Sequence, residues 1–143
     1  MIDPFPPTLN LRIGPNCQPP VLPTYFSYQE EHNSFARATR RCVGACRRRD
    51  SNKGIMCPSY MATNEEKHST RGRARLLFEM LHGGPIDDLW RSAEVEDTLD
   101  LCLGCEGCKS DCPVQVDMAT YKAEFCASLQ GPLAPHVQPI PWA

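Results

Sequence analysis

The chain has 143 residues, enough for one domain, and its 15 basic and 17 acidic residues give a net charge of −2. This balance provides no overall attraction to nucleic acid or to an anionic membrane. Nine cysteines, with no charged start or apolar stretch of a secretory signal at the N-terminus, favour metal ligands over disulfides and predict a cytoplasmic protein. No apolar run approaches the roughly 20 residues needed to cross a bilayer, and a peripheral position at the inner membrane stays open.

The fourteen prolines are concentrated at the two ends of the chain. Seven lie at or before Pro23, and four lie at or after Pro132. We therefore expect an extended arm at residues 1–30, a helical domain at residues 31–130 and a disordered tail at residues 131–143. A central part this small commonly depends on metals or partners for its stability.

Two helices are expected in the first half of the domain. Ser34 can cap a helix that ends at Cys42. Residues 63–66, Thr-Asn-Glu-Glu, have the spacing of a capping box, and an apolar face follows over residues 71–81. The His-Gly-Gly-Pro sequence at residues 82–85 predicts the end of that helix.

Two further helices are expected on either side of a cysteine-rich run. Ser92 opens a helix that leads into Cys102, and Asp117 caps the last helix. The residues predicted to face inward on the last helix are Met118, Tyr121, Phe125, Cys126 and Leu129. No stretch alternates as a strand does, so the predicted fold is mostly α, a small helical ferredoxin-like domain.

The run between residues 102 and 113 has the spacing C-x2-C-x2-C-x3-C-P, which is typical of a ferredoxin-type [4Fe-4S] cluster. Its cysteines are Cys102, Cys105, Cys108 and Cys112. Gly104 and Gly107 suit the tight turn that three thiolates around one cube require. Zinc modules use two separated pairs of ligands, so the spacing favours a cluster over zinc or a disulfide.

A second Cys-Pro pair, Cys57-Pro58, lies upstream and follows Cys42 and Cys46. In two-cluster ferredoxins the cysteine before proline ligates the other cluster. Under that rule the main cluster is held by Cys57, Cys102, Cys105 and Cys108. Cys112 then joins Cys42 and Cys46 in a second site. The alternative keeps all four cysteines of residues 102–112 on one cube.

The second site has only three thiolates, so three outcomes are open: a three-iron cluster, a cube with a non-cysteine ligand, or an empty site. His68 is a candidate for the missing ligand, against the alternative of a capping or hydrogen-bonding role. Cys17 and Cys126 are interpreted as non-ligands, and Cys126 as a small core residue.

Arginines gather in two groups, six between Arg37 and Arg49 and three between Arg71 and Arg75. They can form solvated helix faces, or they can provide positive charge for a cluster or a partner. Few aromatic side chains lie among them, which argues against nucleic acid as a partner.

Four segments, residues 34–44, 54–63, 68–77 and 99–125, together resemble the iron–sulfur region of the FAD-linked oxidases. That family includes D-2-hydroxyglutarate and D-lactate dehydrogenases of the flavin plus iron–sulfur kind. The region is also similar to the iron–sulfur subunits of glycolate oxidase and anaerobic glycerol-3-phosphate dehydrogenase. The likeness covers about residues 1 to 126, and residues 2–14 look like the linker that leaves the flavin part.

This resemblance implies an electron-transfer module, which carries electrons from a flavin-linked 2-hydroxy-acid dehydrogenase to a downstream acceptor. FAD is then expected only on a missing part or on a partner, because this chain has no flavin-binding sequence and no catalytic site of its own. The alternatives are a structural metal-binding module and a truncated, non-functional fragment. Two departures stand out: the family usually has two more residues between the cysteines matching Cys42 and Cys46, and the likeness ends after Phe125.

Overall fold

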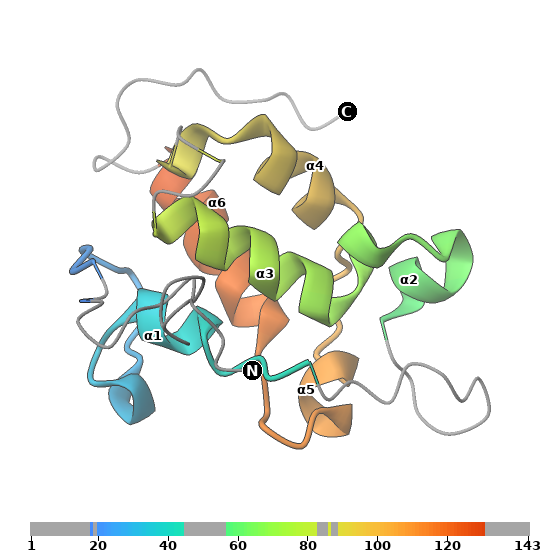
Figure 1. Ribbon diagram of the computed structural model, residues 1–143, viewed down its shortest axis with the longest axis horizontal. Coiled ribbons are helices and arrows are strands. Elements are labelled where there is room, and N and C mark those ends of the chain that lie inside the picture. The colour runs from blue at the N-terminus through green and yellow to red at the C-terminus, as the bar shows by residue number, and fades with distance from the viewer. Residues whose placement is uncertain (1–17, 19, 45–56, 83–85, 87–88, 131–143) are drawn as a thin grey trace, which may run out of the picture.

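The computed structural model describes residues 18, 20–44, 57–82, 86 and 89–130, and these residues form helices and loops with no strand (Figure 1). The α-helices of this part are α1 (Phe35–Thr39), α2 (Pro58–Thr63), α3 (Thr70–Leu81), α4 (Ala93–Asp100), α5 (Gly107–Asp111) and α6 (Met118–Gln130). Short 3-10 helices occur at η1 (Gln29–Glu31), η2 (Glu66–His68) and η3 (Leu89–Arg91). Among the described helices, none has both the length and the apolar character to span a membrane. The prediction of a mostly helical fold is confirmed.

The core forms around α3, which lies across α6 and contacts α1 and α4 (Figure 1). Leu77 and Met80 of α3 are completely buried. Phe35 of α1, Leu99 of α4 and Phe125 of α6 close around them. Burial of side chains of this size stabilises a fold by about 1.5–3 kcal/mol each, so this cluster is the main source of stability within the described residues.

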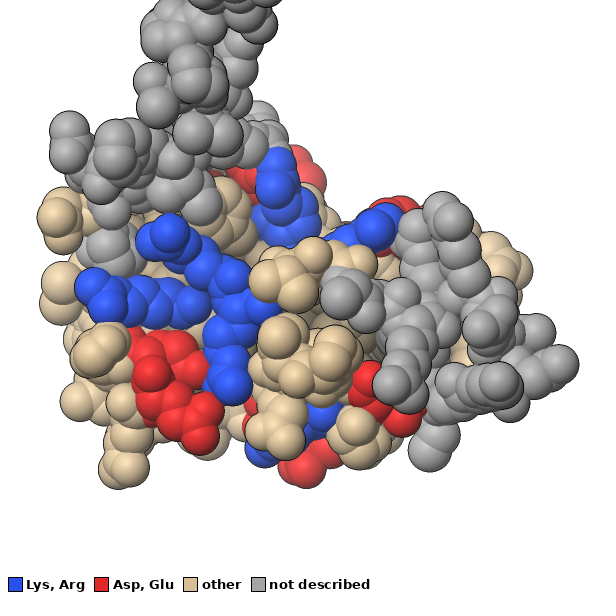
Figure 2. Space-filling view, turned by 60° about the horizontal axis from the view of Figure 1, so that its bottom comes forward, with Lys and Arg blue, Asp and Glu red and all other residues tan. Residues whose placement is uncertain are grey.

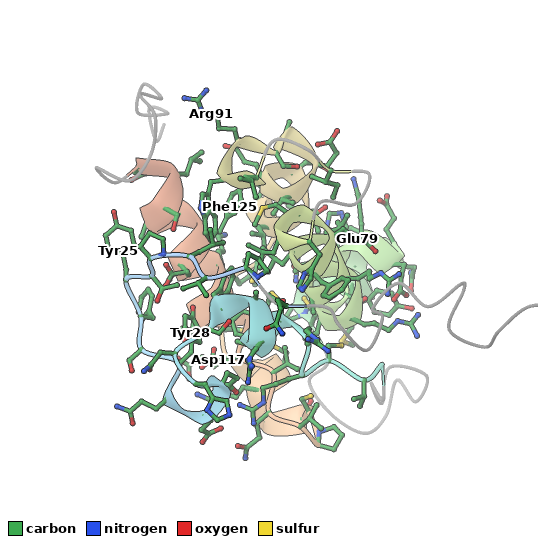
Figure 3. The ribbon with its side chains drawn as sticks, turned by 60° about the vertical axis from the view of Figure 1, so that its left-hand side comes forward. Tyr25, Tyr28, Glu79, Arg91, Asp117 and Phe125 are labelled. Atoms are coloured by element: carbon green, nitrogen blue, oxygen red, sulfur yellow. The ribbon has the colours of Figure 1, made fainter. Side chains whose placement is uncertain are left out.

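An aromatic cluster joins the segment before α1 to the rest of the core. The Phe35 ring stacks on Trp90 at 5.7 Å and meets the edge of Tyr121 at 5.6 Å. Tyr28 lies 5.4 Å from Phe35, and Figure 3 shows it with Tyr25 on the segment that runs beside α6. Ring separations of 4.5–7 Å are favourable for aromatic pairs. The last residues of the predicted arm therefore contribute to the core.

Three predicted helix starts are confirmed by their caps. The Ser34 hydroxyl accepts a hydrogen bond from the Arg37 N–H at 3.3 Å, and the Ser92 hydroxyl accepts one from the Val95 N–H at 3.4 Å. Asp117 accepts from the Thr120 N–H at 3.1 Å. Capping depends on a short polar side chain within the same turn, so the local sequence was sufficient to predict where these helices begin.

The helix predicted to end at Cys42 ends earlier, at Thr39. The Tyr121 hydroxyl donates to the Ala38 carbonyl at 2.8 Å, and the Arg41 N–H also turns back to that carbonyl. Both bonds go to the Ala38 carbonyl, which is in the last turn of α1, and the helix ends there. Cys42 consequently lies in the loop beyond the helix.

The capping-box prediction at residues 63–66 is wrong. Thr63 is the last residue of α2, and Asn64 after it adopts the left-handed conformation with φ 56°. The cap of α3 is Ser69, whose hydroxyl accepts from the Gly72 N–H at 2.8 Å. The far end was predicted correctly, since α3 ends at Leu81; residues 83–85 lie outside the described part.

Candidate metal centre

Four cysteines from two distant segments line one pocket. Cys57 stands at the N-cap of α2 and is 7 % exposed. The other three come from the loop between α4 and α5 and from α5 itself: Cys102, Cys105 and Cys108. Arg73 of α3, Ala119 of α6 and Glu106 of the loop also line the pocket. These are the four cysteines that the crossed rule selects for the main cluster; as ligands they remain a prediction.

The loop that carries three of these cysteines is shaped by two left-handed residues. Gly104 has φ 62° and Glu106 has φ 57°, and Glu106 directly precedes α5. Glycine at position 104 accepts this conformation without a steric penalty. The α5 helix then places Cys108 on its first turn, and the Cys112 N–H closes the turn on the Cys108 carbonyl at 3.0 Å.

Two side chains hold the loop against its neighbours. Lys122 of α6 donates to the Cys102 carbonyl at 2.6 Å and to the Asp100 carbonyl at 3.3 Å. The Ser59 hydroxyl donates to the Leu101 carbonyl. Ser59 follows Cys57 by two residues and Leu101 directly precedes Cys102, so this bond joins the two halves of the pocket.

Arg73 places a positive charge against one of these cysteines. Its Nη1 atom donates to the Cys57 sulfur at 2.8 Å. Burial alone would raise the pKa of the Cys57 thiol, but the Tyr60 N–H, the charge of Arg73 and the Ser59 hydroxyl outweigh it and hold the pKa below its ordinary value. The thiolate is the form that binds metal, so Cys57 is prepared for ligation.

Cys108 has the opposite environment. Burial raises the pKa of its thiol above the usual value, although the Met118 N–H and the Thr70 side chain act in the other direction. A metal bound at this cysteine would have to displace the proton.

In the described part of the chain, no three Cys, His, Asp or Glu side chains converge on a point that could hold a single metal ion. The pocket is instead lined by four separate thiols beside a buried cation. Soft thiolate donors next to a positive charge match the chemistry of an anionic iron–sulfur cluster.

Cys42 lies apart from these four cysteines. It lines a second cavity of about 640 Å³, whose basic residues are Arg40, Arg71 and Arg75. Basic side chains also gather on the face shown in Figure 2, next to an acidic patch. Cys112 is half-buried against the core and does not line this cavity, and Cys46 lies outside the described residues. Joint ligation by Cys42, Cys46 and Cys112 stays a prediction.

Of the remaining candidates, His68 and Cys126 line neither pocket. His68 is buried, with its Nε2 atom 3.8 Å from a Glu65 carboxylate oxygen, and it lines neither pocket. Cys126 is half-buried on α6, and Cys17 lies outside the described part. Sequence reasoning did not single out Arg73 from the nine arginines of its two groups, because only the tertiary packing buries it.

The chain belongs to the family of 4Fe-4S dicluster domains, whose model matches residues 37–117, more than half of the chain. This match includes all seven candidate ligand cysteines. The resemblance predicted from the sequence is therefore confirmed at the level of the family.

Individual relatives point the same way. The chain is 31 % identical to D-2-hydroxyglutarate dehydrogenase of Pseudomonas putida over 119 residues, which covers 62 % of this chain and 12 % of that protein. It is 30 % identical to the glycolate oxidase iron-sulfur subunit of Escherichia coli over 83 residues, covering 58 % of this chain and 17 % of the subunit. The chain thus spans less than a fifth of the curated relatives it matches. No solved structure matches it significantly.

Proposed function

We propose that this chain is an electron-transfer module that holds a [4Fe-4S] cluster on Cys57, Cys102, Cys105 and Cys108. The observation that carries the proposal is the pocket itself, which four thiols from segments 45 residues apart line together. Membership of the dicluster family supports an iron–sulfur role. A bound cluster supplies a carrier for single electrons.

The residues of the pocket have distinct tasks. Arg73 favours the thiolate of Cys57, and Lys122 fixes the backbone at Cys102. Cys105 is exposed, and the neighbouring Leu103 is 72 % exposed. This edge of the site is the one that an electron partner can approach.

The partner is proposed from the relatives. One is named D-2-hydroxyglutarate dehydrogenase and another is an iron–sulfur subunit of glycolate oxidase. We infer that the donor is a flavin-linked dehydrogenase of a 2-hydroxy acid, either a partner or another part of a longer chain. Oxidation of the hydroxy acid to the oxo acid releases two electrons and two protons. A flavin on the donor would supply the electrons one at a time, and this chain would carry them to a downstream acceptor.

A second cluster is proposed on Cys42, Cys46 and Cys112. The family description specifies two clusters, and Cys42 lines a cavity that Arg40, Arg71, Arg75 and Glu66 also line.

The ligand sets can be separated by anaerobic reconstitution of cysteine variants. Cys57→Ala should remove or shift the reduced-state EPR signal of the main cluster, whereas Cys112→Ala should retain that signal and affect only the second site. Each complete cube adds about four irons, so iron and sulfide analysis counts the clusters. Cys126→Ala is the matched control, since Cys126 lines neither pocket.

The opposite result, loss of the main signal in Cys112→Ala and not in Cys57→Ala, would show that one cube uses only the four local cysteines. If the wild-type chain binds stoichiometric zinc and no iron or sulfide, the result would contradict electron transfer and support a structural role for the metal.

A further inference from the structure

Arg73 is a buried cation without a carboxylate partner in the described part of the chain. It is 1 % exposed and is the largest fully buried side chain among these residues. Its neighbours on α3 differ, because Arg71 pairs with Glu66 at 2.7 Å and Arg75 with Glu79 at 2.6 Å, and both arginines are well exposed.

Neither of the hydrogen bonds of Arg73 within the described residues goes to a carboxylate. Nε donates to the Thr98 carbonyl at 3.0 Å, and Nη1 donates to the Cys57 sulfur at 2.8 Å. The Nη2 atom is buried and has no hydrogen-bond partner within the described residues. A guanidinium stays protonated in proteins, so burial cannot neutralise it. A buried charge is strongly unfavourable without a counter-charge, and the thiolate form of Cys57, 2.8 Å from Nη1, is the kind of anion that this site favours.

The location of Arg73 identifies that anion by its chemistry. Arg73 lines the pocket that the four cysteines line, and one of its N–H groups already points at a candidate ligand sulfur. A cluster with four thiolate ligands carries net negative charge. Each electron that it takes from the donor adds one further negative charge beside the guanidinium.

We propose that Arg73 is the internal counter-ion of the main cluster, a positioning residue that stabilises its reduced form and so raises its reduction potential. This role rests on the proposed electron-transfer function. Coulombic attraction is much stronger in a buried site than at the surface, and hydrogen bonds to ligand sulfurs shift the potential in the same direction.

The test is a redox titration, followed by EPR, of the full chain reconstituted with iron and sulfide. Arg73→Met keeps an unbranched side chain but removes the charge and the hydrogen bonds. We expect the equilibrium constant for reduction to fall at least tenfold, which is 59 mV for a one-electron couple. Arg73→Lys keeps the charge, and its potential should lie between those of wild type and Arg73→Met. Lys67→Gln is the control, since Lys67 is an exposed cation paired with Asp97 at 2.9 Å; its potential should equal that of wild type.

Several outcomes would overturn this role. If Arg73→Met holds the full complement of iron at an unchanged potential, Arg73 is only structural. If Arg73→Met holds no cluster, Arg73→Lys decides: retained iron supports the role of the charge, and equal loss of iron in both variants rejects it. A wild-type chain that takes up no iron and sulfide overturns the proposed function itself, and the role of Arg73 with it.

Discussion

At the scale of single residues, Glu124 is the clearest structural feature outside the metal centre. Its side chain is completely buried. One carboxylate oxygen accepts from the Tyr25 N–H and the other from the Phe26 N–H, both at 2.9 Å. The Tyr28 hydroxyl lies 3.4 Å from the second of these oxygens. Burial, together with the negative charge of Glu124, raises the pKa of Tyr28 well above its usual value. Glu124 thus fixes the segment before α1 onto α6.

We predict that Glu124→Gln lowers the free energy of unfolding by about 2 kcal/mol, the scale of hydrogen bonds to charged groups. Glutamine retains one carbonyl oxygen but presents an NH2 group to a second backbone donor. Thermal unfolding of the reconstituted protein measures the loss, and amide exchange should become faster at Tyr25 and Phe26. Ser128→Ala removes only a 3.4 Å contact to Glu124 and should have a smaller effect. Unchanged exchange at both amides in Glu124→Gln would contradict this anchoring role.

At the scale of elements, the junction of η2 and α3 controls how α2 and Cys57 reach the pocket. A Cβ atom at Gly72 would lie 2.0 Å from the Glu66 carbonyl oxygen, so the η2 backbone packs directly on this glycine. The close approach brings the chain from α2 sharply onto the start of α3. The position therefore requires glycine for reasons of space.

Gly72→Ala should destabilise the protein by about 3 kcal/mol, the upper part of the usual range for overpacking, because backbone has to move. The displaced η2 should also weaken the position of Cys57, and we expect faster loss of iron to a chelator. Arg75→Ala on the exposed side of the same helix loses an ion pair and should cost under about 1 kcal/mol. Equal stability and iron retention in the two variants would show that the junction does not position Cys57.

The same junction shows what the sequence could and could not predict. The starts at Ser34, Ser92 and Asp117 were predictable, since each cap bonds within its own turn. Residues 63–66 matched a capping box equally well, yet the true cap is Ser69. Whether α3 begins after residues 63–66 or after Ser69 depends on the fit of η2 against Gly72, which is a tertiary contact. The grouping of the four cysteines was predicted from their motif, whereas the burial of Arg73 depends on packing between helices.

At the scale of the whole molecule, two pairs of described helices differ in length and in place. α3 and α6, with 12 and 13 residues, run through the core. α2 and α5 have 6 and 5 residues, and residues of both line the four-cysteine pocket. Isolated helices below roughly 12–15 residues are marginal in water, so α2 and α5 depend on their surroundings.

We predict that removal of iron loosens α2, α5 and the loop between α4 and α5 more than it loosens α3 and α6. Hydrogen exchange measured by mass spectrometry on the apo and reconstituted chain checks this, and the largest loss of protection should fall on residues 57–63 and 101–111. Uniform loss of protection over all described helices would show instead that the core itself depends on the metal.

The hydrogen bond between Ser59 and Leu101 has a consequence for the way the protein is made. It joins segments more than 40 residues apart, and the ribosome synthesises the first long before the second. A nascent chain that stops before Cys108 lacks one side of the four-cysteine pocket, so a cluster held by Cys57 and Cys108 would have to load after synthesis of the second half. A cluster bound to both segments would then act as a cross-link. Closing a loop of this length lowers the entropy of the unfolded chain by an amount equivalent to about 4 kcal/mol in the disulfide model.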